Sequence, residues 1–170
     1  MKARRRARAI AIQALYEIDC TDHPPDQVLQ HRIEEPNPLD PDDDWVEEEG
    51  LSVEASPLSN VVIDFARHLV FGVLRYRAVL DPFIQEHAPE WPLEQMACID
   101  RTVLRLALFE FAVDARAPVK VVINEAVELA KMFGSESSAR FVNGVLGALA
   151  PLKEVIAERA RAYAARSQGD

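Results

Sequence analysis

The sequence contains few of the features that mark disulfide-bonded, membrane or secreted proteins. It has two cysteines, Cys20 and Cys98, and six glycines in 170 residues. Two cysteines so far apart predict buried free thiols in a reducing compartment. No apolar run approaches the roughly 20 residues of a membrane span. The charged N-terminus has no apolar block after it, as a signal peptide would. We therefore expect a cytoplasmic globular protein.

Motifs that carry catalysis or cofactors are also missing. The chain has no GxGxxG, no Walker-type loop and no nucleophile elbow. Its four histidines are scattered and lack a compact ligand spacing, so we expect no metal site. Glu125 and Glu128 lie three residues apart, but such pairs are more typical of the solvated side of a helix. The sequence thus predicts no catalytic residues and no cofactor.

The net charge of −9 is unevenly distributed along the chain. Residues 1–20 hold five bases and two acids, whereas residues 21–57 hold twelve acids and one base. The rest of the chain is close to neutral, so the acidic total does not argue against a nucleic-acid partner. The dense acid and proline at about 34–57 predict a mobile insert, in which the role of Trp45 stays open.

Apolar residues recur at helical spacing through most of the chain, and no alternating strand pattern occurs. Residues 119–123 are β-branched and would suit a strand, but the helical spacing continues to Phe133. The sequence predicts an all-α protein of about seven helices. Asp81–Pro82 is expected to open a short helix, and Gly144 and Gly147 predict close approach of two helices. The expected helical segments are 2–20, 26–33, one that begins after a cap at Ser56 or Ser59 and ends near Arg77, 81–84, three between Met96 and Pro151, and one from Leu152.

Two stretches suit an anionic, unpaired nucleic acid. The first turns of the N-terminal helix are crowded with cations, although cations oppose the positive end of the helix dipole. A solvated charged tip and an anion site both explain this cluster, and its unfavourable placement favours the anion site. Near residue 140, Phe141 follows a cation and could stack on a base, or could equally belong to the core. The preceding SESS supplies hydroxyl and N–H groups that phosphates use.

Four ordered blocks carry a resemblance to a known family. They read RRRARAIAIQALYEID, VLRLALFE, VVINEAVELAKMFG and ARFVNGVLGALAP. Their order and spacing resemble the bacterial transcription antitermination factor family NusB over nearly the whole chain. The resemblance implies one all-helical RNA-binding domain, 1–170, built of two packed helical bundles. It also implies binding of the single-stranded boxA element of nascent RNA together with the ribosomal protein NusE, within the transcription elongation complex, without catalysis or cofactor.

The resemblance also implies site residues. The expected partner contacts are Asp100 and Ser137, the latter at a position that is often acidic in the family. The insert at about 34–57 is longer and more acidic than the connection usual in the family. It leaves open whether the edge of the protein that carries it is free for a partner or is shielded by the insert itself. Two alternatives remain: a helical module that homodimerises without RNA, and a domain related to ribosomal RNA cytosine methyltransferases, whose cofactor-binding domain this chain lacks. The expected RNA-binding residues are Lys2, Arg4, Arg5, Arg6, Arg8, Gln13, Arg140 and Phe141.

Overall fold

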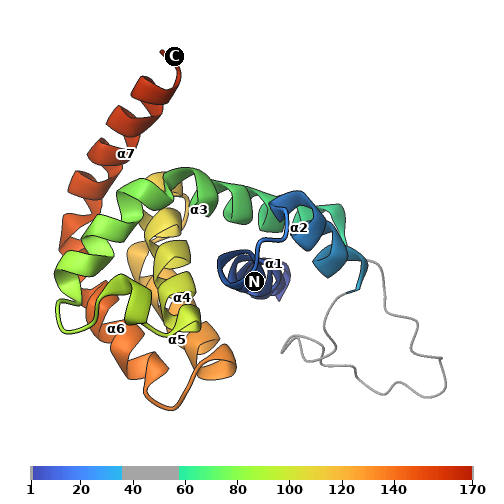
Figure 1. Cartoon of the computed structure of the whole chain (residues 1–170), viewed down its shortest axis with the longest axis horizontal. Helices are drawn as coiled ribbons and strands as arrows, with labels where there is room; N and C mark the ends of the chain where they lie inside the picture. The colour runs from blue at the N-terminus through green and yellow to red at the C-terminus, as the bar shows by residue number, and fades with distance from the viewer. Residues whose placement is uncertain (1, 36–57, 170) are drawn as a thin grey trace. The chain divides into compact units, whose positions relative to one another are not determined.

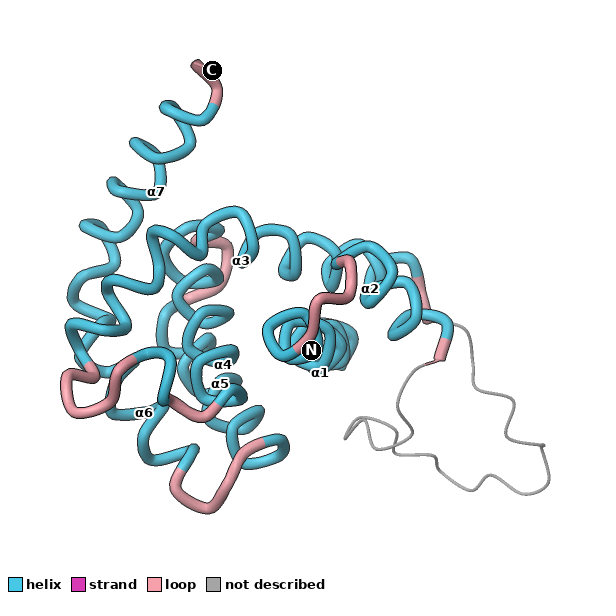
Figure 2. Tube along the Cα trace, in the orientation of Figure 1, coloured by secondary structure: helices cyan, strands magenta, loops and turns pink. Residues whose placement is uncertain are grey.

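Every regular element that the structure describes is a helix (Figures 1 and 2). The structure is a computed structural model that describes residues 2–35 and 58–169. Most of the predicted insert, with Trp45, lies outside these residues. The chain divides into two compact units, Met1–Val70 and Phe71–Asp170. The all-helical prediction is confirmed. The seven α-helices in the described residues are α1 Lys2–Cys20, α2 Pro25–Glu34, α3 Asn60–His87, α4 Cys98–Leu108, α5 Val119–Phe133, α6 Ser138–Leu149 and α7 Lys153–Ser167.

In the first unit, α2 packs against α1, and a polar cluster fixes the turn between them. Glu17 on α1 accepts hydrogen bonds from the ring of His23 at 2.9 Å and from Arg32 on α2 at 3.0 Å. The Thr21 hydroxyl donates to the Glu17 carbonyl at 2.7 Å. The hydrogen bond from His23, aided by that from Arg32, lowers the pKa of Glu17 against the opposing effect of burial. The charged form of Glu17 is therefore favoured by folding.

Helix α3 corrects one prediction, because it runs without interruption through Pro82. We expected Asp81 to cap a new helix there. A proline inside a helix removes a hydrogen bond and costs about 3 kcal/mol. Asp81 instead pairs with Arg105 on α4, which donates from Nε to Oδ1 at 2.7 Å and from Nη2 to Oδ2 at 3.0 Å. The prediction that Asp81 caps a helix considered only its neighbours in sequence, and Arg105 lies 24 residues away along the chain.

Helix α4 is the buried centre of the second unit. Its residues from Thr102 to Leu108 are all buried, as expected of a helix surrounded by other helices. Helices α5 and α6 pack against it. The chain continues in a π-helical turn, η2 Phe109–Asp114, which α7 covers. Phe109 lies so close to Gly72 that a Cβ there would fall 2.7 Å or less from three of its ring atoms. The glycine therefore allows this close approach.

Several smaller predictions were wrong. Gly144 and Gly147 are exposed, and a Cβ at either would meet nothing within 4 Å, so none of the helices in the described residues packs against them. Glu125 is 7% exposed and not on a solvated face, since its side of α5 turns inward with Ala126. Cys20 and Cys98 were expected to be buried, but Cys20 is exposed because it ends α1, and Cys98 is half-buried. In the described residues, no helix is long and apolar enough to cross a membrane.

Candidate nucleic-acid interface

The basic residues of α1 differ in how much of each side chain solvent can reach. Arg4 is exposed, Arg5 and Arg6 are half-buried, and Arg8 is 3% exposed. The guanidinium carbons of Arg4 and Arg8 lie 5.8 Å and 5.7 Å from the ring centroid of Phe65 on α3. Both distances suit cation–π contacts. Arg4, Arg5 and Arg6 can therefore reach a phosphate, whereas Arg8 packs inside the first unit.

The first turn of α1 carries no acidic residue to offset these cations. Its charge therefore remains unfavourable for the helix dipole and favourable for an anion. Gln13 follows Arg6 by seven residues, two helical turns later, and so lies on the same side of α1. Both are half-buried. The side chain of Lys2 is outside what the structure describes. Arg6 and Gln13 thus share one side of α1, whereas Arg4, nine residues before Gln13, lies on the opposite side.

In the second unit, the loop between α5 and α6 is built around Ser138. This serine is 1% exposed, and its Oγ accepts from the Ser135 N–H at 3.0 Å. The hydroxyls of Ser135 and Ser137 lie 3.2 Å apart. A Cβ on Gly134 would meet the Ser138 hydroxyl at 2.5 Å, which explains the glycine. A serine directly after Gly134 would suit an N-cap by residue type, but the N-cap of α6 is Ser137, and the Ser135 hydroxyl faces those of Ser137 and Ser138.

A pocket of about 530 Å³ opens beside this loop. Three of the predicted site residues, Asp100, Ser137 and Phe141, line it together. Asp100 lies in the first turn of α4 and is 8% exposed, and Phe141 is half-buried in the first turn of α6. Arg140 is exposed and is not a lining residue. The predicted partner contacts and the predicted stacking residue therefore share one pocket.

Sequence analysis missed Trp91, which lines the same pocket and is 54% exposed. Its loop is fixed by Gln85 on α3. The Gln85 amide donates to the Trp91 carbonyl at 3.1 Å and accepts from the Leu93 N–H at 2.7 Å. Arg101 donates to the Leu93 carbonyl at 2.9 Å. The sequence carries little signal for Trp91, because a single exposed apolar side chain in a loop is common in proteins.

The chain matches the model of the NusB family over residues 5–151. It belongs to that family. The transcription antitermination protein NusB of Roseiflexus castenholzii is 49% identical over 146 residues, which cover 85% of this chain and 89% of that protein. The protein of the same name from Chloroflexus aggregans is 45% identical over 158 residues, covering 92% and 91%. The family prediction is confirmed.

Solved structures agree on the fold. T. maritima NusB is 28% identical and superposes with a TM-score of 0.67, covering 91% of this chain and 90% of that one. The NusB chain in a structure of antitermination factors NusB and NusE with double-stranded RNA is 23% identical, with a TM-score of 0.68 and coverage of 94% and 98%. This second likeness shows the fold alone.

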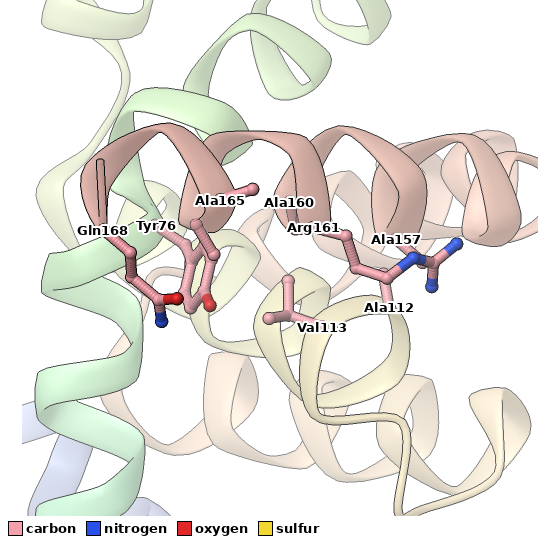
Figure 3. A pocket seen from close by; sticks show the side chains of 9 residues that line it. Tyr76, Ala112, Val113, Ala157, Ala160, Arg161, Ala165 and Gln168 are labelled. Atoms are coloured by element: carbon pink, nitrogen blue, oxygen red, sulfur yellow. The ribbon is translucent and has the colours of Figure 1, made fainter.

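The part of the chain beyond the family match forms one wall of a second pocket, of about 380 Å³ (Figure 3). Tyr76 and Gln168 lie side by side at one end of it, away from Arg161, and four alanines of α7 also line it. Its lining offers one cation and little other polar chemistry. In the described residues, no group of three histidine, cysteine or acidic side chains could hold a metal. The pocket beside Phe141 is therefore the better candidate site in the second unit.

Proposed function

We propose that this protein is a transcription antitermination factor that binds the boxA element of nascent ribosomal RNA together with the ribosomal protein NusE. Its membership of the NusB family carries the proposal, because relatives 49% and 45% identical over most of their length are named as antitermination proteins. The function is binding and not catalysis, and it belongs in the cytoplasm with the transcription elongation complex. A solved NusB structure that also holds NusE and RNA supports the choice of partners.

Two separate surfaces of the chain support RNA binding. The exposed and half-buried arginines of α1 supply cations that contact phosphates without reading sequence. Phe141 supplies a ring on the wall of an open pocket, where an unpaired base can stack. NusE is proposed to complete the site, because the basic cluster is small and RNA binding by this chain alone should be weak. Asp100 and Ser137 are proposed as partner contacts, and both line the pocket beside Phe141.

The division of labour between the two surfaces can be tested by salt dependence. Changing Arg4 and Arg5 to Ala should reduce the slope of log affinity against log salt by roughly 0.7 per lost phosphate contact. Affinity should fall equally for boxA and scrambled RNA. A control chain with Arg161 and Arg166 of α7 changed to Ala has the same net charge and should keep the slope. An unchanged slope in the Arg4/Arg5 variant would remove α1 from the interface.

Phe141→Ala should behave differently. The slope of log affinity against log salt should stay the same. The free energy of RNA binding should weaken by about 1–3 kcal/mol, the usual contribution of a stacked base. Circular dichroism must show that the variant is folded, since a half-buried ring can also stabilise the fold. A folded Phe141→Ala protein with normal RNA affinity would return Phe141 to the core.

A further inference from the structure

The pocket beside α7 combines an apolar floor with one exposed cation (Figure 3). Small side chains of η2 and α7 form the floor, and Tyr76 of α3 lies at one end. All of these residues belong to the second unit. Arg161 lines the pocket and forms no ion pair or hydrogen bond among the residues that the structure describes. Such a site can take an apolar side chain and a carboxylate together.

The chain segments around this pocket are basic, although the whole chain is acidic. Residues 71–80 and 159–169, which supply Tyr76 and most of the α7 wall, hold five arginines and no acidic residue. Glu158, one residue before the second range, is exposed and offsets these charges only in part. Asp114, at the end of η2, pairs with Arg116 at 2.9 Å. The pocket therefore presents positive charge that an acidic ligand can neutralise.

The aromatic rings near the pocket already contact one another, which makes it a poor site for a nucleic-acid base. The ring centroid of Tyr76 lies 6.2 Å from those of Phe109 and Tyr163, and the guanidinium carbon of Arg75 lies 5.2 Å from it. The other lining residues offer no ring on which a base could stack. A peptide needs no such ring. Its apolar side chain fits among alanines, and the Tyr76 hydroxyl and the Gln168 amide can bond its backbone.

We propose that this pocket docks an acidic segment of a protein partner, with an apolar side chain of the segment between η2 and α7 and a carboxylate on Arg161. The volume of about 380 Å³ lies within the usual range for ligand pockets. Arg161 can bind a carboxylate through two parallel hydrogen bonds. None of the lining residues belongs to the proposed RNA site, so the docking surface goes beyond the proposed function and does not depend on it.

The test follows the backbone amide signals of the isotope-labelled full chain during titration with a short peptide in which leucine alternates with glutamate. The signals of Ala112, Arg161 and Gln168 should shift and saturate. A matched peptide with lysine in place of every glutamate should bind at least about tenfold more weakly, because its charges repel Arg161. Equal affinity for the two peptides, or no saturable shift with the glutamate peptide, would overturn the proposal.

Two pairs of variants locate the contact. Ala164→Leu should fill the pocket and weaken binding of the glutamate peptide at least about tenfold, whereas Ala162→Leu, exposed on α7 and outside the lining, should not. Leucine is a good helix former, so both variants should keep α7. Arg161→Ala should weaken binding about fivefold, the most that an exposed ion pair usually contributes. Arg166→Ala is its control, because Arg166 is exposed and does not line the pocket. Normal binding in both Ala164→Leu and Arg161→Ala would place the peptide elsewhere and refute the docking surface.

The same variants separate this partner from other occupants of the pocket. Ala164→Leu and Arg161→Ala should each leave the affinity for boxA RNA and its salt slope unchanged, and a loss of RNA affinity in both would assign the pocket to RNA instead. Sedimentation of the unaltered chain should show no dimer that Ala164→Leu dissociates, since such a dimer would assign the pocket to a second copy. The peptide titration contains no RNA, so its result and the outcome of the RNA-binding tests are independent.

Discussion

The ion pair between Asp81 and Arg105 should be among the strongest single contacts in the second unit. The side chain of Arg105 is 9% exposed and that of Asp81 is 24% exposed, and two hydrogen bonds join them. Removing one member of a buried pair commonly costs 3–5 kcal/mol. Water can reach Asp81, and Arg105 has further interactions. We therefore expect Asp81→Asn to lower the free energy of unfolding by about 2–3 kcal/mol.

Urea unfolding followed by circular dichroism measures this loss. For an m-value of roughly 2 kcal/mol/M, the midpoint should fall by about 1 M with no change of m. The control is Glu128→Gln, which breaks an ion pair with Lys131 whose two side chains are more than half exposed. Such a pair contributes less than about 1 kcal/mol. If Asp81→Asn cost no more than this control, the ion pair would not stabilise the packing of α3 against α4.

Three further predictions concern stability. Gly72→Ala should destabilise by about 1–3 kcal/mol because its methyl group would overlap the ring of Phe109; Phe109→Leu in the same chain should return part of the loss in a thermal melt, and no loss in the single variant would contradict the close contact. Ala115 has φ 54°, so Ala115→Gly should stabilise by up to about 1 kcal/mol, and a lower Tm would refute this. Glu17 has a lowered pKa in the fold, so its contribution is present above pH 4.5 and is lost as pH falls through the lower folded value. Glu17→Gln should therefore lower stability at neutral pH and cost progressively less in acid, and a constant difference in urea midpoint would contradict the sign.

The spacing of apolar residues predicted those helices that depend on residues close together in the sequence. This spacing predicted a helix through Phe133 although residues 119–123 are β-branched, and α5 spans Val119–Phe133. Contacts between distant residues were not predictable in the same way. Asp81 resembled a helix cap because its partner, Arg105, lies on another helix. Gly144 suggested helix contact by its type, yet its surroundings are open.

The candidate site shows the same limit. Phe141 and the arginines of α1 were predicted from local features, an aromatic residue next to a cation and a cluster of cations in a first helical turn, and the family blocks contain them as well. Trp91 was missed because its meaning depends on the pocket that its loop forms with the start of α4 and α6. The Oδ1 of Asp100 is buried without a hydrogen-bond partner among the described residues, and this too is a property of packing, since the sequence of α4 shows an ordinary acidic residue in a first turn.

The central claim is that this chain and NusE form one binding site for boxA RNA. Its most direct test is the anisotropy of a labelled single-stranded boxA RNA and of its scrambled counterpart, titrated with the full chain in the presence and absence of NusE at one fixed salt concentration. We expect weak binding by the chain alone, and a Kd for boxA that falls at least about tenfold with NusE while the scrambled RNA gains much less. An unchanged Kd on adding NusE, or an equal gain for both RNAs, would contradict the claim.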